Sequence, residues 1–180
     1  MDYYKKKLFV ARVNLDDIIE GKIERWFTHK QGILHRGYTV ILTFQDKYIL
    51  QQRKHPVFNR CYDLSYSSHQ VFINEKLQED LQAIYEGLLR EWNLKKDDLA
   101  EHPIKNGKFY YKSQDLKSKY IEHEIDYVYQ AKLKELPHPN LDFAYGYKII
   151  DRSQLLQIKK LSSLTLAPWV EKIIKENLVK

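Results

Sequence analysis

One change of hydrophobic period constrains the fold of this chain more than any other feature. In the segment EDLQAIYEGLLREWNL, residues 79–94, apolar side chains recur every three to four positions, which predicts an amphipathic helix. We expect Asn93 to end it, because asparagine tolerates the left-handed conformation of a helix C-cap. Strand-like segments precede and follow this helix. This order favours an α+β domain with a mixed sheet packed between helices.

The strongest predicted strand is HRGYTVILTF, residues 35–44, which is rich in β-branched and aromatic residues. A short turn joins it to residues 47–54 as a hairpin. Residues 16–26 are expected to form two extended pieces that meet at a turn at Glu20–Gly21. Further strands are predicted at 8–13, 61–69, 107–113, 120–133 and 145–151, and helices at 152–161 and 167–178, the last with a proline near its start.

Composition narrows the class of protein. The chain has 180 residues, of which 43% are hydrophobic and 30% charged, a balance typical of one globular domain. No apolar run approaches the roughly 20 residues that span a bilayer, so no membrane span is expected. The single cysteine excludes an intrachain disulfide framework and favours a cytoplasmic protein. The net charge is +6, but the lysines are scattered, and we expect no nucleic-acid partner.

Two carboxylates stand in one strand-like segment, YIEHEIDYVY, residues 120–129. Because strand side chains alternate between faces, Glu122 and Glu124 point the same way, and Asp126 continues that parity. Two readings follow from the strand alone: a stripe that faces solvent, or ligands of a hard divalent cation. Three histidines would complete such a site if they converge on it: His29, His35 and His69.

A resemblance sharpens this interpretation. The chain contains, in order, GILHRGYTV, YILQQR, SSH, EHEIDYV and APW. In these segments and their approximate spacing it resembles the type 1 isopentenyl-diphosphate isomerases, which belong to the Nudix superfamily. The resemblance covers residues 8–174 and implies a Nudix α/β/α sandwich with a mixed β-sheet, in one domain over residues 1–180.

The resemblance also implies two metals and a substrate, a small-molecule isoprenoid diphosphate. Glu91 matches the carboxylate that helps to hold Mg²⁺ on the substrate diphosphate. Arg53 matches a diphosphate-binding arginine, Arg25 falls where the family has a lysine, and Lys54 is a candidate for a further phosphate contact. One divalent ion, Mn²⁺ or Zn²⁺, is expected on His29, His35, His69, Glu122 and Glu124.

In that family the reaction is a protonation of the substrate alkene followed by removal of a proton from the other side. Glu124 and Tyr111 match the groups near the protonated carbon, and Trp169 matches the ring that faces the carbocation. Ser67 stands where the family has its second proton-transfer group, a cysteine. Cys61 lies six residues upstream, about 20 Å along an extended strand, and is too distant to replace it.

Other departures keep three functions open. Gly87 replaces an arginine that contacts diphosphate in the family, and Arg90 stands at a metal-binding glutamate of the Nudix hydrolases. The resemblance favours an isomerase of isopentenyl or dimethylallyl diphosphate, or of a related isoprenoid diphosphate. One alternative is a diphosphate-binding protein without turnover, which the changes at Ser67 and Gly87 favour. The other is a pyrophosphohydrolase, which the altered helix disfavours.

Overall fold

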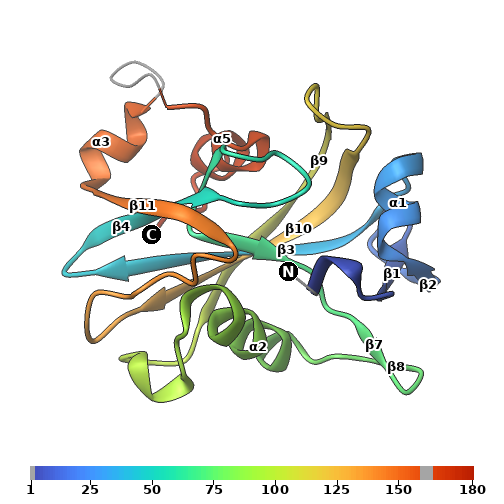
Figure 1. Cartoon of the computed structure of the whole chain (residues 1–180), viewed down its shortest axis with the longest axis horizontal. Helices are drawn as coiled ribbons and strands as arrows, with labels where there is room; N and C mark the ends of the chain where they lie inside the picture. Colours follow the sequence, from blue (N-terminus) through green and yellow to red (C-terminus); the bar gives the residue numbers. More distant parts are fainter. Residues whose placement is uncertain (1–2, 159–163) are drawn as a thin grey trace.

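A mixed β-sheet forms the middle layer of the protein (Figure 1). The computed structural model describes residues 3–158 and 164–180. Strand order in the sheet is β11-β4-β3-β1-β2, with β10 beside β3, β9 beside β10, and the short β5 and β6 beside β4 and β3. The strands are β1 Phe9–Val13, β2 Ile19–Glu24, β3 His35–Phe44, β4 Lys47–Arg53, β5 Tyr62–Asp63, β6 Tyr66–Ser68, β9 Ile104–Gln114, β10 Ile121–Lys132 and β11 Ala144–Ile150.

Helices cover both faces of this sheet, as the α/β/α prediction requires (Figure 1). The long helix lies on one face, where its buried side chains pack against Tyr38, Val40 and Leu42 of β3. On the opposite face, Trp169 and Val170 pack against Ile41 of β3 and other apolar residues. The helices are α1 Arg25–Gln31, α2 Asp80–Trp92, α3 Arg152–Leu156 and α5 Pro168–Lys175, with short 3-10 turns η1 Tyr3–Lys5 and η2 Lys96–Asp98.

The parallel pair β3–β10 is the element of the sheet that positions the site. Its register places Glu124 opposite His35 and continues to Lys132 opposite Thr43. On its other side β10 pairs antiparallel with β9, so that Tyr111 lies opposite Glu124. Tyr111, Glu124 and His35 therefore occupy one row across three strands.

Several predicted elements are confirmed, including the hairpin of β3 and β4 and the left-handed cap at Asn93, where φ is 54°. The predicted turn at Glu20–Gly21 is wrong, because β2 runs straight through these residues. Helix α1 then begins at Arg25, and the Glu24 carboxylate caps it by accepting from the backbone N–H groups of Trp26 and Phe27. The predicted helix at 152–161 lies partly outside the described residues.

The predicted strand at 61–69 is two short strands. The reason lies in β3 and β4, which pair with each other only beside their hairpin turn. Beyond it they separate, and β5 pairs with β4 while β6 pairs with β3. A small hairpin, β7 Phe72–Ile73 with β8 Lys76–Leu77, follows and was not predicted.

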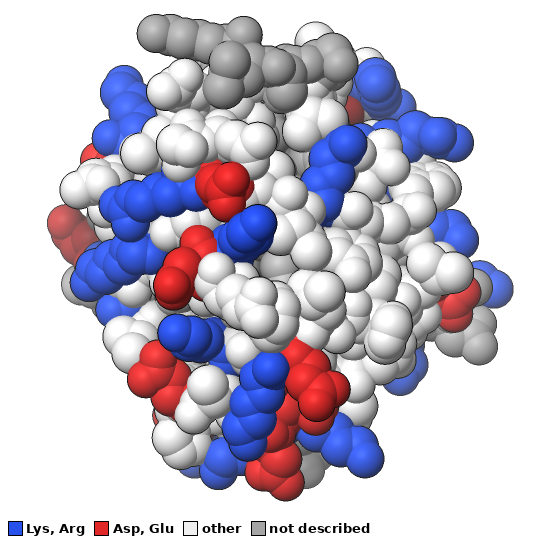
Figure 2. All heavy atoms as spheres, turned by 90° about the vertical axis from the view of Figure 1, so that its left-hand side faces the viewer, with Lys and Arg blue, Asp and Glu red and all other residues white. Residues whose placement is uncertain are grey.

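The face shown in Figure 2 carries lysines, arginines and acidic residues side by side, with apolar and uncharged surface between them. This mixture fits the scattered charge of the sequence. Among the described residues, no helix is long and apolar enough to cross a membrane.

Candidate metal centre

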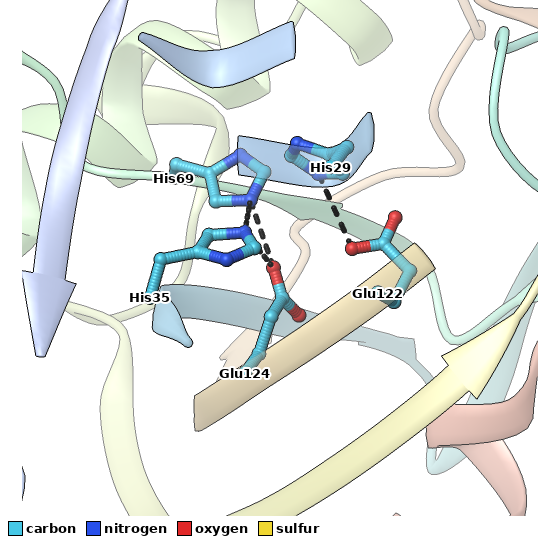
Figure 3. Close-up of side chains that lie close together, drawn as sticks. All are labelled: His29, His35, His69, Glu122 and Glu124. Atoms are coloured by element: carbon cyan, nitrogen blue, oxygen red, sulfur yellow. Dashed lines mark hydrogen bonds and ion pairs between the residues drawn. The ribbon is translucent and has the colours of Figure 1, made fainter. Parts of the chain in front are cut away.

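Five histidine and glutamate side chains converge at one end of the parallel strand pair (Figure 3). Each offers one ligand atom, and all of these atoms lie within 4.8 Å of one another. They come from four separate parts of the chain: α1, β3, the residue after β6, and β10. These are the five residues predicted to bind one divalent ion: His29, His35, His69, Glu122 and Glu124.

The carboxylates of β10 do not form a stripe that faces solvent. Glu122, Glu124 and Asp126 are only 4%, 5% and 1% exposed. They lie on the sheet face that α5 covers, because they share the parity of the core residue Val128. Three buried carboxylates so close together on one strand need cations or protons to compensate their charge.

The hydrogen bonds of two histidines aim their remaining nitrogens into the cluster. Nδ1 of His29 lies 2.6 Å from the carbonyl of Arg25, and Nδ1 of His35 lies 2.8 Å from the carbonyl of Ile33. A carbonyl only accepts, so each Nδ1 carries the proton and each Nε2 faces the other ligands. In metal-binding histidines the other ring nitrogen commonly donates to a carbonyl in this way and fixes the orientation of the ring.

The separations inside the cluster suit a metal polyhedron. Nε2 of His35 lies 3.2 Å from Nε2 of His69 and 3.3 Å from Oε1 of Glu124. Two ligands at right angles, each about 2.1 Å from a metal, are about 3 Å apart. Oε2 of Glu122 is buried without a hydrogen-bond donor and lies 3.3 Å from Nε2 of His29. The residues therefore fit a divalent cation, which would satisfy this oxygen.

Two members of the cluster, His69 and Glu124, favour the protonation states that bind metal. Against the effect of burial, the charge of Glu122 raises the pKa of His29. Burial lowers the pKa of His69 to about 4, which keeps its imidazole neutral. Burial alone would raise the pKa of Glu124, but its close contacts with the imidazoles of His35 and His69 hold the pKa well below its usual range. A neutral imidazole and an ionised carboxylate are the forms that bind metal.

A small cavity of about 30 Å³ adjoins the cluster. It has room for a water molecule or an ion but not for a prenyl diphosphate, whose pockets typically measure about 300 Å³ or more. Lys54 does not line it; the ammonium donates instead to the carbonyl of Leu141 at 2.9 Å. Sequence-predicted residues that do line it, besides metal ligands, are Arg25, Arg53, Ser67, Glu91, Tyr111 and Trp169.

Two aromatic residues take up positions that suit the predicted chemistry. The hydroxyl of Tyr111 donates to Oε2 of Glu124 at 2.5 Å, whereas the neighbouring Tyr110 is 46% exposed. Burial, and then the charge of Glu124, raise the pKa of Tyr111 well above its usual value, so it keeps its proton. Trp169 is buried, and its ring face lies 4.8 Å from the guanidinium carbon of Arg53.

Ser67 is tied into a buried polar network that the sequence did not reveal. Its hydroxyl donates to Oδ1 of Asp63 at 3.1 Å and lies 2.8 Å from the hydroxyl of Thr39. Asp63 also accepts from Nε1 of Trp169 and from Arg53. The sequence signal that could have identified Asp63 as a partner was its position four residues before Ser67. Cys61 belongs to the second hydrophobic core and does not line the cavity.

Helix α2 supplies one carboxylate and one unexpected cation. Glu91 is buried, lines the cavity and accepts a hydrogen bond from Arg90 at 3.0 Å. Burial raises the pKa of Glu91, although Arg90 opposes this. Only one carboxylate of the helix therefore reaches the cavity, next to an arginine.

Comparison with solved structures defines the class of protein by its fold. A protein of Deinococcus radiodurans superposes with a TM-score of 0.66 at 16% identity, over 93% of this chain and 98% of that one. A MutT Nudix hydrolase of Burkholderia pseudomallei superposes with a TM-score of 0.59 at 13% identity, over 82% and 98%. At these identities the likeness concerns the fold, which is the Nudix fold.

Sequence comparison points to one branch of that class. The chain is 27% identical to isopentenyl-diphosphate Δ-isomerase 1 of Mesocricetus auratus, over 83% of this chain and 71% of that protein. It is also 27% identical to isopentenyl-diphosphate Δ-isomerase I of Camptotheca acuminata, over 100% and 86%. No known family model matches the chain. The chain therefore has the Nudix fold and is similar in sequence to isopentenyl-diphosphate isomerases.

Proposed function

We propose that the protein is a metal-dependent isomerase of isopentenyl and dimethylallyl diphosphate, or of a related isoprenoid diphosphate. The observation that carries the proposal is the buried convergence of three histidines and two glutamates within 4.8 Å. The same five residue types match the metal ligands of the isomerase family, whereas the helix carboxylates of the hydrolases are reduced to Glu91. Relatives at 27% identity are named isopentenyl-diphosphate Δ-isomerases.

Glu124 and Tyr111 would carry the first proton transfer. Their 2.5 Å hydrogen bond holds a proton between a phenol and a carboxylate at the edge of the cavity. Protonation of the alkene by this pair leaves a tertiary carbocation, with the electron pair of the double bond forming the new C–H bond. A divalent ion on the cluster, when bound, would supply positive charge that keeps Glu124 ionised and oriented as the acceptor of the Tyr111 hydroxyl.

Trp169 and the cationic side chains would hold the substrate. The guanidinium carbon of Arg53 already lies 4.8 Å from the Trp169 ring centroid, so this ring interacts with a positive charge within the site. Arg25 and Arg53 would bind the diphosphate, with Mg²⁺ held by Glu91 on the same group. Because the cavity measures only about 30 Å³, lining side chains must move before substrate enters.

The experiment is an incubation of the protein with isopentenyl diphosphate in D₂O, with Mg²⁺ and either Mn²⁺ or Zn²⁺, followed by ¹H and ³¹P NMR. The isomerase predicts deuterium in the substrate and the appearance of dimethylallyl diphosphate. A chelator-treated sample is the control and should stay unchanged. Release of phosphate or pyrophosphate would instead indicate a hydrolase.

One observation favours a second candidate, a diphosphate-binding protein without turnover. The hydroxyl at the cysteine position donates to Asp63, and a serine has no thiolate to offer as a base. Such a protein would bind isopentenyl diphosphate, measured by calorimetry, and leave it chemically unchanged in D₂O.

A further inference from the structure

The ring of Tyr3 lies between two arginines beside the cavity. The guanidinium carbon of Arg25 is 4.9 Å from the ring centroid, and that of Arg90 is 4.2 Å from it. Tyr3 lines the cavity itself. Two positive groups therefore approach one aromatic ring at the place where α1 and α2 face the metal cluster.

These guanidinium groups are incompletely satisfied. The Nε atoms of Arg25, Arg53 and Arg90 are all buried without a hydrogen-bond partner. Arg53 pairs with Asp63 and Arg90 with Glu91, but Arg25 has no carboxylate partner within the described part of the chain. Buried cationic donors without acceptors are costly, and an anion with several oxygens would satisfy them.

Arg90 lies close to position 87, where this chain lacks the arginine of the family. Gly87 stands where the family has an arginine on diphosphate, and this position has no room for one. A Cβ at Gly87 would lie 2.7 Å from Cε2 of Tyr66 and 3.0 Å from the hydroxyl of Tyr38. Positions 87 and 90 are three residues apart, so they lie on neighbouring parts of one helix face.

We propose that Arg90 and Arg25 form a phosphate subsite in which Arg90 supplies the charge missing at position 87, and that the ring of Tyr3 fills this subsite and is displaced by the anion. This inference rests on the proposed function, because it assumes that the pocket takes a diphosphate. It adds a binding residue and a segment that must move. Displacing η1 also gives the cavity the extra volume that a substrate needs.

Contacts of η1 agree with a displaceable element. Arg25 donates a hydrogen bond to the carbonyl of Tyr3 at 3.3 Å, and Nε1 of Trp26 donates one to the carbonyl of Tyr4 at 2.8 Å. Both are single hydrogen bonds to backbone, and η1 contains no buried residue. An oxyanion is a stronger acceptor for Arg25 than this carbonyl, because both partners would then be ionised.

Calorimetric titration of the full chain with inorganic pyrophosphate and Mg²⁺ tests the subsite. We expect Arg90→Gln to weaken pyrophosphate binding about 10- to 100-fold, the effect of losing charge-assisted hydrogen bonds. Arg90→Lys should lose less. Arg12→Gln is the matched control, because Arg12 is an exposed arginine paired with Glu20, and it should bind like the wild type.

Each outcome separates this inference from the proposed function. A wild-type protein that does not bind pyrophosphate overturns the proposed function and the subsite with it. Wild-type affinity in Arg90→Gln overturns the subsite alone. Titration with Mg²⁺ and no pyrophosphate should give the same Mg²⁺ affinity for the wild type and Arg90→Gln. If Arg90→Gln instead loses as much affinity for Mg²⁺ as for pyrophosphate, Arg90 acts only through Glu91, and the subsite is overturned.

Tyr3→Ala provides a second test that does not depend on the folding of the Arg90 variants. Removing a ring that competes for two guanidinium groups should tighten pyrophosphate binding about threefold or more, as the strength of exposed cation–π contacts indicates. Unchanged or weaker binding in Tyr3→Ala would show that the ring does not occupy the subsite and would overturn the displacement.

Discussion

The hydroxyl of Ser67 donates to the carboxylate of Asp63, which the guanidinium of Arg53 and the indole of Trp169 hold in turn. Ser67, which stands at the position of the family's second proton-transfer group, is thus anchored to a carboxylate that already accepts several hydrogen bonds. The arrangement explains how a polar side chain is accommodated there without giving the reactivity of a thiol.

Ser67→Cys should raise the isomerisation rate by about 10-fold or more, since a thiol near the cavity can form a thiolate and transfer protons. The measurement is the rate of deuterium entry and of dimethylallyl diphosphate formation. Ser68→Cys is the matched control: this neighbour also lines the cavity, but its hydroxyl accepts from Arg90. Equal isomerisation rates in Ser67→Cys, Ser68→Cys and the wild type would contradict the assignment of residue 67 to the proton-transfer position.

Glu122→Gln should weaken Mn²⁺ or Zn²⁺ binding about 10-fold or more, because it removes an anionic ligand whose Oε2 has no other partner. Calorimetry and the metal-dependent rise in Tm would both report this loss. Glu101→Gln, at an exposed position, should behave like the wild type. Metal binding of normal strength in Glu122→Gln would place the ion elsewhere.

Gly87→Ala should destabilise the protein by about 1–3 kcal/mol, against the usual gain of about 1 kcal/mol for alanine in a helix. The added Cβ would press on the Tyr66 ring, whose hydroxyl is held by the carbonyl of Ile84. Urea unfolding gives the difference in free energy. Leu89→Ala, at a half-exposed position of α2, is expected to change stability by no more than about 0.5 kcal/mol.

Asp17 provides a test of pH-dependent stability away from the cavity. Its carboxylate accepts from Arg36 and Lys108, both at 2.6 Å, and from Tyr127. Burial alone would raise the pKa of Asp17, but these hydrogen bonds hold it below the usual value. A depressed folded-state pKa adds stability above the unfolded pKa, and this is lost as the pH falls through the folded pKa.

Asp17→Asn should therefore cost about 1–3 kcal/mol near neutral pH. The difference from the wild type should shrink as the pH falls from about 4, where Asp17 of the unfolded chain takes up a proton, through the lower pKa of Asp17 in the folded protein. Urea unfolding at several pH values measures this. Asp46→Asn is the matched control, because Asp46 is also an aspartate at positive φ but its side chain is 95% exposed. A constant difference across pH would contradict the charged role of Asp17.

The sequence predicted local features of the site better than their convergence. The period-2 pattern placed Glu122 and Glu124 on one face, and the cap at Asn93 followed from residue type. Burial of that face could not follow from the strand alone, since it depends on α5 packing over it. Helix α1 was missed because its seven residues show no apolar period. The hydrogen bond from Lys54 to the carbonyl of Leu141 could not be predicted, because these two residues are distant in sequence.

The register of β3 and β10 has a consequence for the order of folding. His35 and Glu124 become neighbours only when two parallel strands meet, after the whole intervening chain has been placed. Parallel pairing across such a separation is costly in loop entropy and forms late. We therefore expect a metal ion to recognise only the finished topology. Its binding would report completed folding and would not guide the chain toward it.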